Sequence, residues 1–425
     1  MNEDFLYYIW TYYLGGKSFL STTNEKLLIE KPGHRNLDSG PDFFNGLIRI
    51  GNTLWAGNIE IHIRASDWYK HDHQKDSAYD NIILHVVYEA DQMINRQNGE
   101  PIPTLELKGK FNESLFRTYQ GFLLSDQWIP CQNEIAKVGH FEIKSWLYRI
   151  AIERLEQKTQ RIRDNLLISQ SNFNEVFYIQ LLSSFGFKTN SDAFEQLGRS
   201  LPYAVLAKHK TNLMQLEALL LGQAGLLRGD FKDAYSLALK TEFKFLSQKY
   251  SLTPLNAVIW KFMRMRPANF PSIRMAQFAH IFYKSTALIQ KILEAKQLQD
   301  VTELFQTKTS PYWHTHFRLD HQSPPSRKSM GKSSIHLILI NTIIPFVFVY
   351  GQYKQDAELE EKALNWLGNL APEKNTIIRH FEKLGVTAST ALQSQALIQL
   401  KNNYCSRKQC LHCNIGHQIL KEISK

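Results

Sequence analysis

The sequence predicts an α/β N-terminal domain followed by a large all-α domain, and three observations predict this order. In the first third of the chain, apolar and polar residues alternate at period two, whereas from about residue 141 the apolar residues recur at the 3.6-residue period of a helix. Of the 425 residues, 43% are hydrophobic, which is enough for two or three domains with cores of their own. Residues 1–140 carry 13 Lys and Arg against 18 Asp and Glu, and residues 141–425 carry 37 against 22, so the two parts also differ in the sign of their charge.

This charge distribution favours a polyanionic partner. The whole chain has a net charge of +10, and the basic part follows the acidic part. Lys and Arg side chains on the helical domain would contact the phosphates of a nucleic acid, while carboxylates in the acidic part would suit metal ions. The sequence therefore predicts a nucleic acid as partner, and it is silent on protein partners.

The N-terminus and the most apolar segment bear on localisation. The chain begins with Met-Asn-Glu-Asp, without a basic stretch leading into an apolar run, so we expect no secretory signal and a cytoplasmic protein. Residues 337–350 are the most apolar stretch, but Asn341, Thr342 and Pro345 interrupt them. Because a spanning helix needs about 20 apolar residues, no membrane association is predicted.

In the N-terminal domain, a short aromatic helix is predicted first, over residues 5–14. Strands follow that are rich in Ile, Val, Leu and Trp and are bounded by Gly, Pro or Asn. They are residues 27–29, 46–50, 54–63, 82–88 and 104–107. Between the third and fourth strands, residues 68–81 are polar enough for a surface helix or an ordered loop.

In the helical part, Gly and Pro residues mark the ends of helices of ordinary length. Residues 323–332 are polar, basic and without periodicity, which predicts a mobile loop. The domain boundaries that follow are 1–135 for the α/β domain, 136–403 for the helical domain and 404–425 for a cysteine-containing tail packed on the preceding domains.

Two acidic residues belong to neighbouring arms of a predicted hairpin. Asp42 follows a Gly-Pro pair just before one strand, and Glu60 lies within the next strand. Because side chains alternate across a strand, Glu60 and His62 share one face while the isoleucines between them point to the other. The Gly-Asn pair after the first strand supplies the turn.

The pairing register decides whether these side chains meet. A two-residue turn would pair Asp42 with Ile61 and put it on the wrong face. A three-residue turn, or a one-residue bulge at Gly46 or Gly57, would pair Asp42 with His62 and bring the acids together, with Cβ atoms roughly 5 Å apart. Two carboxylates this close repel each other, and Mg²⁺ or Mn²⁺ would remove the repulsion.

These residues resemble the PD-(D/E)XK nuclease superfamily, in which a Pro-Asp and a Glu-x-Lys on adjacent strands of a small αβββαβ core bind metal for phosphodiester hydrolysis. The resemblance covers residues 1 to about 110 and carries over to Asp42, Glu60 and His62. It implies a restriction-endonuclease-like core. The chain departs from the motif because His62 stands at the lysine position, where it could be a base, a metal ligand or neither. The simpler interpretation of all three residues is a solvated strand face.

Polar residues continue after this strand. Asp67 is the candidate for a further catalytic residue, at the end of the strand that carries the motif. On a helix, His73, Asp76 and Asp80 would share a face, which could hold a second cation or orient a water. A solvated polar surface is the simpler interpretation of this segment.

Three of the four cysteines are crowded near the C-terminus. Cys405, Cys410 and Cys413 have the spacing Cys-x4-Cys-x2-Cys, which suits Zn²⁺ or an iron–sulfur cluster in a reducing compartment. The fourth ligand would be either His417, giving a local zinc knuckle, or Cys131, giving a four-cysteine site. Some nucleases of the superfamily named above resemble the second arrangement and hold a [4Fe–4S] cluster, which makes that cluster the alternative to zinc here.

A basic and aromatic stretch offers candidates for nucleic-acid binding. Four cations are interleaved with aromatic residues around two prolines, and guanidinium groups on phosphates with rings against bases would make this a contact surface. Packing of the aromatic residues in the core, with the cations in solvent, is the blander interpretation. The four candidates are Lys261, Arg264, Arg266 and Arg274.

Over its whole length, the order of the motifs is similar to that of an uncharacterised bacterial family, domain of unknown function 2851. The motifs are Gly-Pro-Asp-Phe, Glu-Ile-His with Ser-Asp-Trp, Ile-Pro-Cys, Arg-Pro-Ala-Asn-Phe-Pro-Ser-Ile-Arg and Cys-Leu-His-Cys. The leading functional hypothesis is a metal-dependent nuclease that hydrolyses DNA or RNA. The alternatives are a nuclease-like protein that binds nucleic acid without cleaving it, and a helical interaction scaffold with a structural metal site.

Overall fold

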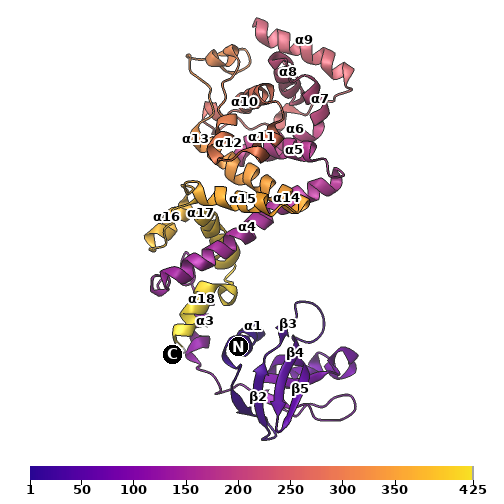
Figure 1. The fold of residues 1–425 in the computed structure, drawn as a ribbon, viewed down its shortest axis with the longest axis vertical. Coiled ribbons are helices and arrows are strands. Elements are labelled where there is room, and N and C mark those ends of the chain that lie inside the picture. The colour runs from indigo at the N-terminus through magenta and orange to yellow at the C-terminus, as the bar shows by residue number, and fades with distance from the viewer. Residues whose placement is uncertain (424–425) are drawn as a thin grey trace. The chain divides into compact units, whose positions relative to one another are not determined.

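The computed structural model describes residues 1–423 and divides the chain into two compact units (Figure 1). Unit 1 consists of Met1–Trp146, Leu384–Val386 and the chain from Leu400 onward, and unit 2 consists of Leu147–Lys383 and Thr387–Gln399. Unit 1 contains a mixed β-sheet with helices, and unit 2 is mostly helical. The predicted order of an α/β part followed by a helical part is confirmed.

Unit 1 is built around one seven-stranded sheet. The strand order is β1-β2-β4-β5-β6-β7, with β3 paired to β4 outside this path. Pairing is antiparallel from β1 to β5 and parallel from β5 through β6 to β7. The strands are β1 (Ser18–Leu20), β2 (Lys26–Lys31), β3 (His34–Arg35), β4 (Phe43–Ile50), β5 (Thr53–Arg64), β6 (Ile82–Glu89) and β7 (Thr104–Glu106).

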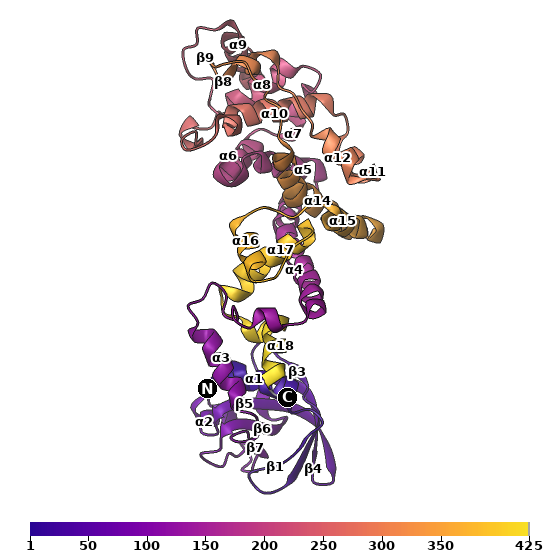
Figure 2. The same cartoon turned by 90° about the vertical axis from the view of Figure 1, so that its left-hand side faces the viewer.

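Helix α1 (Glu3–Tyr13) confirms the predicted N-terminal helix and packs against β5. The side chain of Asn2 caps it by accepting a hydrogen bond from the Phe5 N–H at 3.2 Å, and the acidic residues of its first turn complement the helix dipole. Its apolar face, which includes Phe5, Ile9 and Trp10, is fully buried. Figure 2 shows α1 beside α3 (Ser114–Leu124) and α18 (Asn414–Ile423), so the C-terminal residues complete unit 1.

Between β5 and β6 the chain forms short turns of helix. The first is α2 (Asp67–Lys70), and two single turns of 3₁₀ helix follow, His73–Lys75 and Ser77–Tyr79. Asp72 lies between them with φ of 58°, a left-handed conformation that aspartate tolerates better than most residues. Three short helical turns with a left-handed residue after the first make this segment an ordered loop rather than one surface helix.

Unit 2 is an assembly of helices that pack mainly as neighbours in sequence, such as α5 on α6, α8 on α9 and α14 on α15. Helix α4 (His140–Ile168) begins in unit 1 and continues into unit 2. The remaining helices of unit 2 are α5 (Phe173–Phe185), α6 (Phe187–Ser200), α7 (Tyr203–Lys208), α8 (Leu213–Gln223), α9 (Ala234–Lys249), α10 (Pro271–Lys284), α11 (Leu288–Glu294), α12 (Leu298–Leu304), α13 (Lys332–Ile338), α14 (Ile344–Lys354), α15 (Ala357–Asn369), α16 (Thr376–Lys383) and α17 (Ala391–Gln399). A two-stranded hairpin, β8 (His316–Arg318) with β9 (His321–Gln322), precedes α13.

The most apolar helix of unit 2 runs from Lys332 to Lys354 and is longer than the apolar stretch in the sequence indicated. A π-helical turn at Leu339–Ile343 joins α13 to α14, and the Asn341 amide there donates to the Leu337 carbonyl at 2.9 Å, so the polar residues do not break the helix. By length and composition this helix could cross a membrane, but 72% of its most apolar window is buried inside the protein. Such burial is typical of a core helix.

Residues 323–332 differ from the mobile loop that their composition predicts. They form no helix before Lys332, yet the Lys328 side chain is 4% exposed, with Nζ donating to the carbonyls of His314 at 3.4 Å and Ser326 at 3.3 Å. The Gln277 amide of α10 donates to the Lys328 carbonyl at 2.9 Å. The segment is therefore tied to α10 by hydrogen bonds that a composition-based prediction does not see.

A buried carboxyl group lies inside unit 2. Glu217 of α8 is 0% exposed and accepts hydrogen bonds from Trp313 Nε1 at 2.8 Å and the Tyr235 hydroxyl at 2.7 Å, both at Oε2. No partner is present for its Oε1 among the described residues. Burial raises the pKa of Glu217 to about 7, so the group is easily protonated in the folded protein.

Candidate metal centre

The hairpin of β4 and β5 sets the position of Asp42. At the turn, Ile50 pairs with Thr53, whereas at the other end Phe43 pairs with Ile59, so the register shifts by one residue between them. The shift lies between Phe43 and Gly46, where a β-bulge places one extra residue on β4.

The bulge brings the acids opposite each other. Continuing the pairing from Phe43 with Ile59 places Asp42 across from Glu60, and not across from His62 as predicted for a bulge at Gly46. The predicted bulge at Gly46 is present, but the partner predicted for Asp42 was wrong. An extra residue on β4 moves Asp42 toward Glu60, whereas an extra residue on β5 or a longer turn would pair it with His62. A Cβ on Gly46 would lie 2.1 Å from Cδ1 of Ile59, so a larger residue at the bulge would force the buried Ile59 side chain to move.

Asp42 and Glu60 interlock through the backbone. The Asp42 N–H donates to Glu60 Oε2 at 3.1 Å, and the Ile61 N–H donates to Asp42 Oδ2 at 2.9 Å. The Tyr7 hydroxyl of α1 donates to Asp42 Oδ1 at 2.9 Å. Each carboxyl group is therefore held in place by fixed donors.

Both carboxyl groups are difficult to ionise in this position. Glu60 is 4% exposed, and burial raises its pKa to about 8. Burial also raises the pKa of Asp42 to about 7, with a further contribution from the charge of Glu60. Glu3 lies close enough for the charge of Asp42 to raise its pKa, second to the effect of its own burial. Three acids thus share a region in which a cation would stabilise their charged forms.

Four imidazole rings lie together here, and two of them, His62 and His73, contact Glu60. His62 follows Glu60 on β5, and His85 is the partner of Glu60 on the parallel strand β6. Nδ1 of His62 lies 2.8 Å from Nε2 of His85, and Nε2 of His62 lies 3.2 Å from Nδ1 of His71. Nε2 of His73 is 3.3 Å from Oε1 of Glu60, and Nε2 of His62 is 3.6 Å from the same oxygen.

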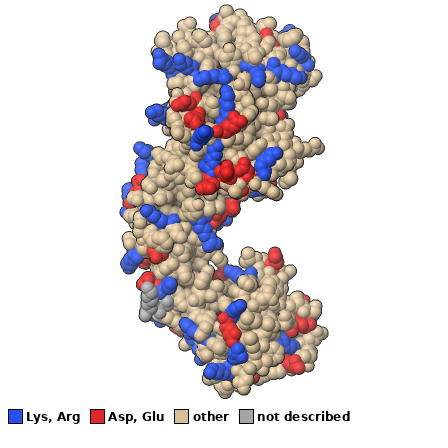
Figure 3. All heavy atoms as spheres, viewed as in Figure 1, with Lys and Arg blue, Asp and Glu red and all other residues tan. Residues whose placement is uncertain are grey.

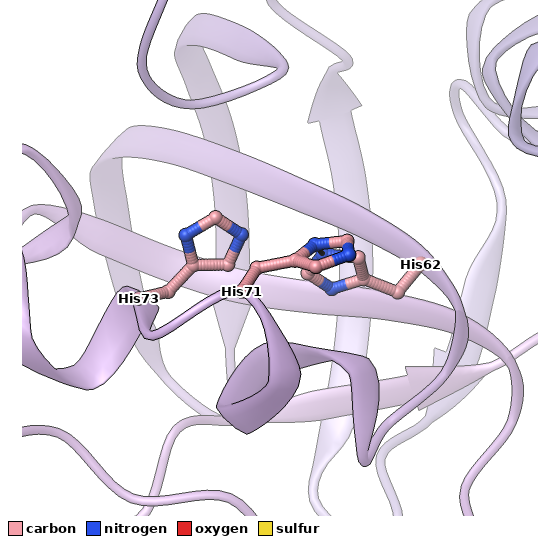
Figure 4. Close-up of side chains that lie close together, drawn as sticks. All are labelled: His62, His71 and His73. Atoms are coloured by element: carbon pink, nitrogen blue, oxygen red, sulfur yellow. Dashed lines mark hydrogen bonds between the residues drawn. The ribbon is translucent and has the colours of Figure 1, made fainter.

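Figure 4 shows His71 and His73 projecting from the segment after α2 toward His62. One nitrogen from each of these three residues lies within 4.8 Å of the others, an arrangement that could hold a metal ion. The residues range from buried to exposed in the order His62, His73 and His71, so the group is open to solvent on the His71 side.

The buried imidazoles are in the form that binds metals. Burial lowers the pKa of His62 to about 3, with further contributions from His73 and His71, and burial likewise lowers the pKa of His85 and of His73. A neutral imidazole has a free lone pair on one ring nitrogen, which a metal ion needs.

Aromatic residues shield the cluster. The Tyr79 ring stacks on His73 with centroids 3.9 Å apart, and Trp68, which is 1% exposed, contacts the rings of His73 and His85 edge-on. Burial raises the pKa of Tyr79 to about 12, and the charge of Glu60 adds to this effect. The shield lowers the local dielectric constant and strengthens any ionic interaction inside it.

A divalent ion fits the donors that are present. Nε2 of His73 is buried and has no hydrogen-bond partner among residues 1–423, although it lies close to Glu60. An orphaned buried nitrogen beside two buried carboxyl groups is costly in a metal-free protein. Coordination would satisfy the nitrogen and the carboxylates together, and it would use the imidazole and oxygen ligands common in transition-metal sites.

The other predicted acids of this region point elsewhere. Asp67 accepts hydrogen bonds from the Arg64 N–H at 3.0 Å and from Lys70 Nζ at 2.5 Å, so it closes its own turn. Asp76 accepts from the Ala78 N–H at 2.9 Å and caps a 3₁₀ turn. Asp80 is exposed and precedes β6. None of these three belongs to the histidine group.

The four cysteines are free thiols, and all lie in unit 1. Cys131, Cys410 and Cys413 are each 7% exposed, and Cys405 is half-buried. Burial raises the pKa of all four thiols, and Cys413 raises the pKa values of the other three further, so the sulfur atoms lie near one another. They do not form a closed ligand set, because the three histidines alone bring their ligand atoms within 4.8 Å among the described residues. His417 instead has its Nδ1 2.9 Å from the Tyr8 hydroxyl.

The four predicted nucleic-acid-binding cations differ in their exposure to solvent. Lys261, Arg264 and Arg266 are exposed on the irregular segment between α9 and α10. Arg274 is 4% exposed, and its guanidinium donates to Gln277 Oε1 at 2.9 Å and to Asn269 Oδ1 at 2.6 Å. These bonds hold the guanidinium group of Arg274 inside unit 2, so it is not available to bind a phosphate.

Four residues of the centre were not predicted as part of it: His71, His85, Glu3 and Tyr7. The His-x-His spacing of His71 and His73 was the available signal for one of them. The others come from α1 and β6, and their approach depends on how these elements pack on β5.

Comparisons with known proteins identify a family for this chain. Neither the curated proteins nor the solved structures include a match to this chain. The model of one protein family, described as a protein of unknown function (DUF2851), matches residues 3–376. Since that match covers nearly the whole chain, the protein belongs to the DUF2851 family.

Proposed function

We propose that this protein is a metal-dependent hydrolase that cleaves phosphodiester bonds of nucleic acid. One observation carries the proposal: Asp42 and Glu60 converge with His62, His71 and His73 in a shielded cluster that opens to solvent on one side. Carboxyl groups with raised pKa values beside unpartnered imidazole nitrogen are typical of a functional site rather than of a core built for stability.

Residues of the site would have different roles in this hydrolysis. Asp42 and Glu60 supply negative charge that a divalent ion neutralises, and Tyr7 holds Asp42 in position. An ion bound there would polarise a phosphoryl oxygen and lower the pKa of an attacking water. His71, the exposed member of the group, lies on the solvent side, from which substrate and water would reach the ion.

The ligand types favour Mn²⁺ or Zn²⁺ over the Mg²⁺ that two carboxylates alone would suggest. Mg²⁺ takes oxygen ligands almost exclusively, whereas imidazole nitrogen suits later divalent ions. The resemblance to PD-(D/E)XK nucleases supports the same reaction class, with His62 at the position of the usual lysine. The excess of 37 Lys and Arg over 22 Asp and Glu in residues 141–425 supports a nucleic acid as substrate.

A cleavage assay with matched variants tests this proposal. The wild-type chain, Glu60→Gln and Glu30→Gln would be stripped with EDTA and supplied with Mn²⁺, Zn²⁺ or Mg²⁺, with single-stranded DNA, duplex DNA or RNA as substrate. Glu30 is an appropriate control because it lies on the same sheet and pairs with Arg49 at the surface. Cleavage that survives Glu30→Gln and is lost in Glu60→Gln supports the proposal.

Three results would count against it. Equal residual cleavage in the wild type and in Glu60→Gln would point to a contaminating nuclease. Salt-sensitive binding of nucleic acid without any cleavage would favour a nuclease-like binding protein, and no binding at low salt would favour a scaffold.

For the cysteines, we propose one structural metal cofactor held by Cys131, Cys405, Cys410 and Cys413. Their mutual effects on pKa support the grouping, and the contact of His417 with Tyr8 favours Cys131 as the fourth ligand. Zinc with Zn–S bonds of about 2.3 Å would need sulfur atoms within about 4 Å of one another. Among the described residues, no three of these sulfur atoms all lie within 4.8 Å of one another, which favours an iron–sulfur cluster. Absorption near ~400 nm in anaerobically purified protein would support the cluster, and colourless protein with one zinc would contradict it.

A further inference from the structure

A second candidate site lies in unit 2, well separated in sequence from the metal centre. A cavity of about 980 Å³ is lined by residues of α10, α12, α13 and the segments between them. Its volume is in the range of pockets that hold small ligands. We call it the lysine pocket, after Lys284, Lys308 and Lys332, which belong to its lining.

The three lysines come from different parts of the fold. Lys284 ends α10, Lys308 follows α12, and Lys332 begins α13. Among the described residues, none of the three forms an ion pair with a carboxylate within 4.0 Å. Three unpaired ammonium groups around one cavity repel each other, and a bound anion would turn this repulsion into attraction.

The acidic residue of the lining does not balance them. Glu303 is part of the wall, and the Gln299 amide donates to its Oε1 at 3.0 Å. One carboxylate against three ammonium groups leaves a positive cavity. Figure 3 shows a row of Lys and Arg across the upper part of the face that it displays, with few Asp or Glu beside it, so positive charge also gathers at other places on unit 2.

Polar groups on the wall complement the lysines. His336 follows Lys332 by one helical turn on α13, and its Nε2 is buried and has no hydrogen-bond partner among residues 1–423. Ser329, Ser333 and Thr307 also belong to the lining, and each carries a hydroxyl group. These groups add hydrogen-bond donors to the charges.

The charges of two of the lysines reach the same neighbour. The Thr307 hydroxyl lies 2.8 Å from Nδ1 of His280, and the pKa of His280 is lowered by burial and then by the charges of Lys284 and Lys308. The charges of Lys284 and Lys308 therefore both reach His280, which is bonded to Thr307 of the lining. The lining also includes the buried apolar residues Ile335 and Leu339, and an apolar surface strengthens charge interactions beside it.

We propose that the lysine pocket binds the phosphate group of a phosphorylated ligand. A phosphate dianion presents several acceptor oxygens, which match several ammonium and hydroxyl donors arranged around one cavity. The phosphate could belong to a free nucleotide or to a nucleic-acid backbone, and these sources share the chemistry. The site is independent of the metal centre, because it needs neither a metal ion nor cleavage.

Calorimetric titrations in EDTA at constant low ionic strength test the proposal with three probes: pyrophosphate, adenosine monophosphate and a single-stranded DNA 12-mer. The variants are Lys308→Gln and Lys332→Gln, whose side chains are exposed, so both should fold. The control is Lys244→Gln, an exposed lysine on α9 outside the pocket. We expect at least one probe to bind the wild type and the control equally, and to bind each pocket variant at least tenfold more weakly.

The probes also distinguish the two sources. If pyrophosphate and the mononucleotide bind and the 12-mer binds no tighter, the ligand is a free phosphorylated molecule. If the 12-mer binds much tighter and the pocket variants lose that gain, the ligand is a nucleic-acid backbone. Absence of binding for all three probes, or equal binding by the pocket variants and the control, would overturn the proposal. Because EDTA prevents metal-dependent cleavage, none of these results depends on whether the hydrolase proposal is right.

Discussion

Replacing Asp42 with asparagine should stabilise the metal-free protein while removing its response to metal. The folded chain holds this carboxyl group with a pKa of about 7, mainly because of burial and then because of Glu60. An acid whose pKa is raised on folding prefers its protonated form, so its favourable contribution is full at low pH and is lost as the pH rises toward 7. Above pH 7, the difference from an ordinary carboxyl pKa corresponds to about 4 kcal/mol at most.

Asparagine cannot ionise, so it avoids this loss of stability, and it keeps the local hydrogen bonds. Its oxygen can accept from the Ile61 N–H, and its amide can donate to the Tyr7 hydroxyl, which then acts as the acceptor. At pH 8 in EDTA, Asp42→Asn should therefore be more stable than the wild type by up to about 4 kcal/mol, and the difference should shrink by pH 5. A metal ion at a hundred times its dissociation constant should stabilise only the wild type, by about 2.7 kcal/mol.

Urea denaturation at pH 5 and pH 8, with EDTA or with Mn²⁺, measures both effects. Asp38→Asn is the control, because Asp38 is exposed in the same loop. The reasoning is refuted if Asp42→Asn is no more stable than the wild type at pH 8 without metal, or if it keeps the full stabilisation by Mn²⁺.

Three further substitutions test other parts of the structure. Glu217→Gln should raise stability at pH 8 by about 3 kcal/mol and flatten its decline between pH 4.5 and 7, because the raised pKa makes the charged acid unfavourable; thermal denaturation across pH checks this, and an unchanged pH profile would contradict it. Gly33→Ala should lower the melting temperature, because Gly33 has φ of 87° and a Cβ there would lie 2.5 Å from the Phe44 carbonyl oxygen. Arg274→Lys should destabilise unit 2 by about 1–3 kcal/mol without weakening nucleic-acid binding, so a selective loss of binding would show that the guanidinium does contact phosphate.

The sequence indicated the hairpin of the candidate site but not its register. Alternation around Glu60 and the Gly-Asn turn predicted the hairpin because both signals are local. The position of the extra residue on β4 depends on packing between Gly46 and Ile59 across the strands. A sequence pattern within one strand does not predict this contact between two strands.

His62 and His73 were predicted as separate candidates, but their convergence with His71 and His85 was not, for a related reason. His71 and His73 belong to an irregular segment whose course depends on the reversal at Asp72. His85 reaches His62 through parallel pairing of β5 with β6, which is set by a long connection and by the packing of the sheet. The helical character of unit 2 followed from 3.6-residue periodicity, but the lysine pocket depends on how separate helices meet.

Unit 1 is interrupted in sequence by unit 2, and this has a consequence for synthesis of the protein. The sheet and α1 emerge from the ribosome early, whereas the residues from Leu400 that finish the same unit emerge after more than two hundred others. At about 5–20 residues per second, the unfinished unit waits on the order of 10 to 50 seconds for its last helix. During that interval the apolar surfaces that α18 later covers remain open, so the nascent chain exposes them to aggregation and to chaperones.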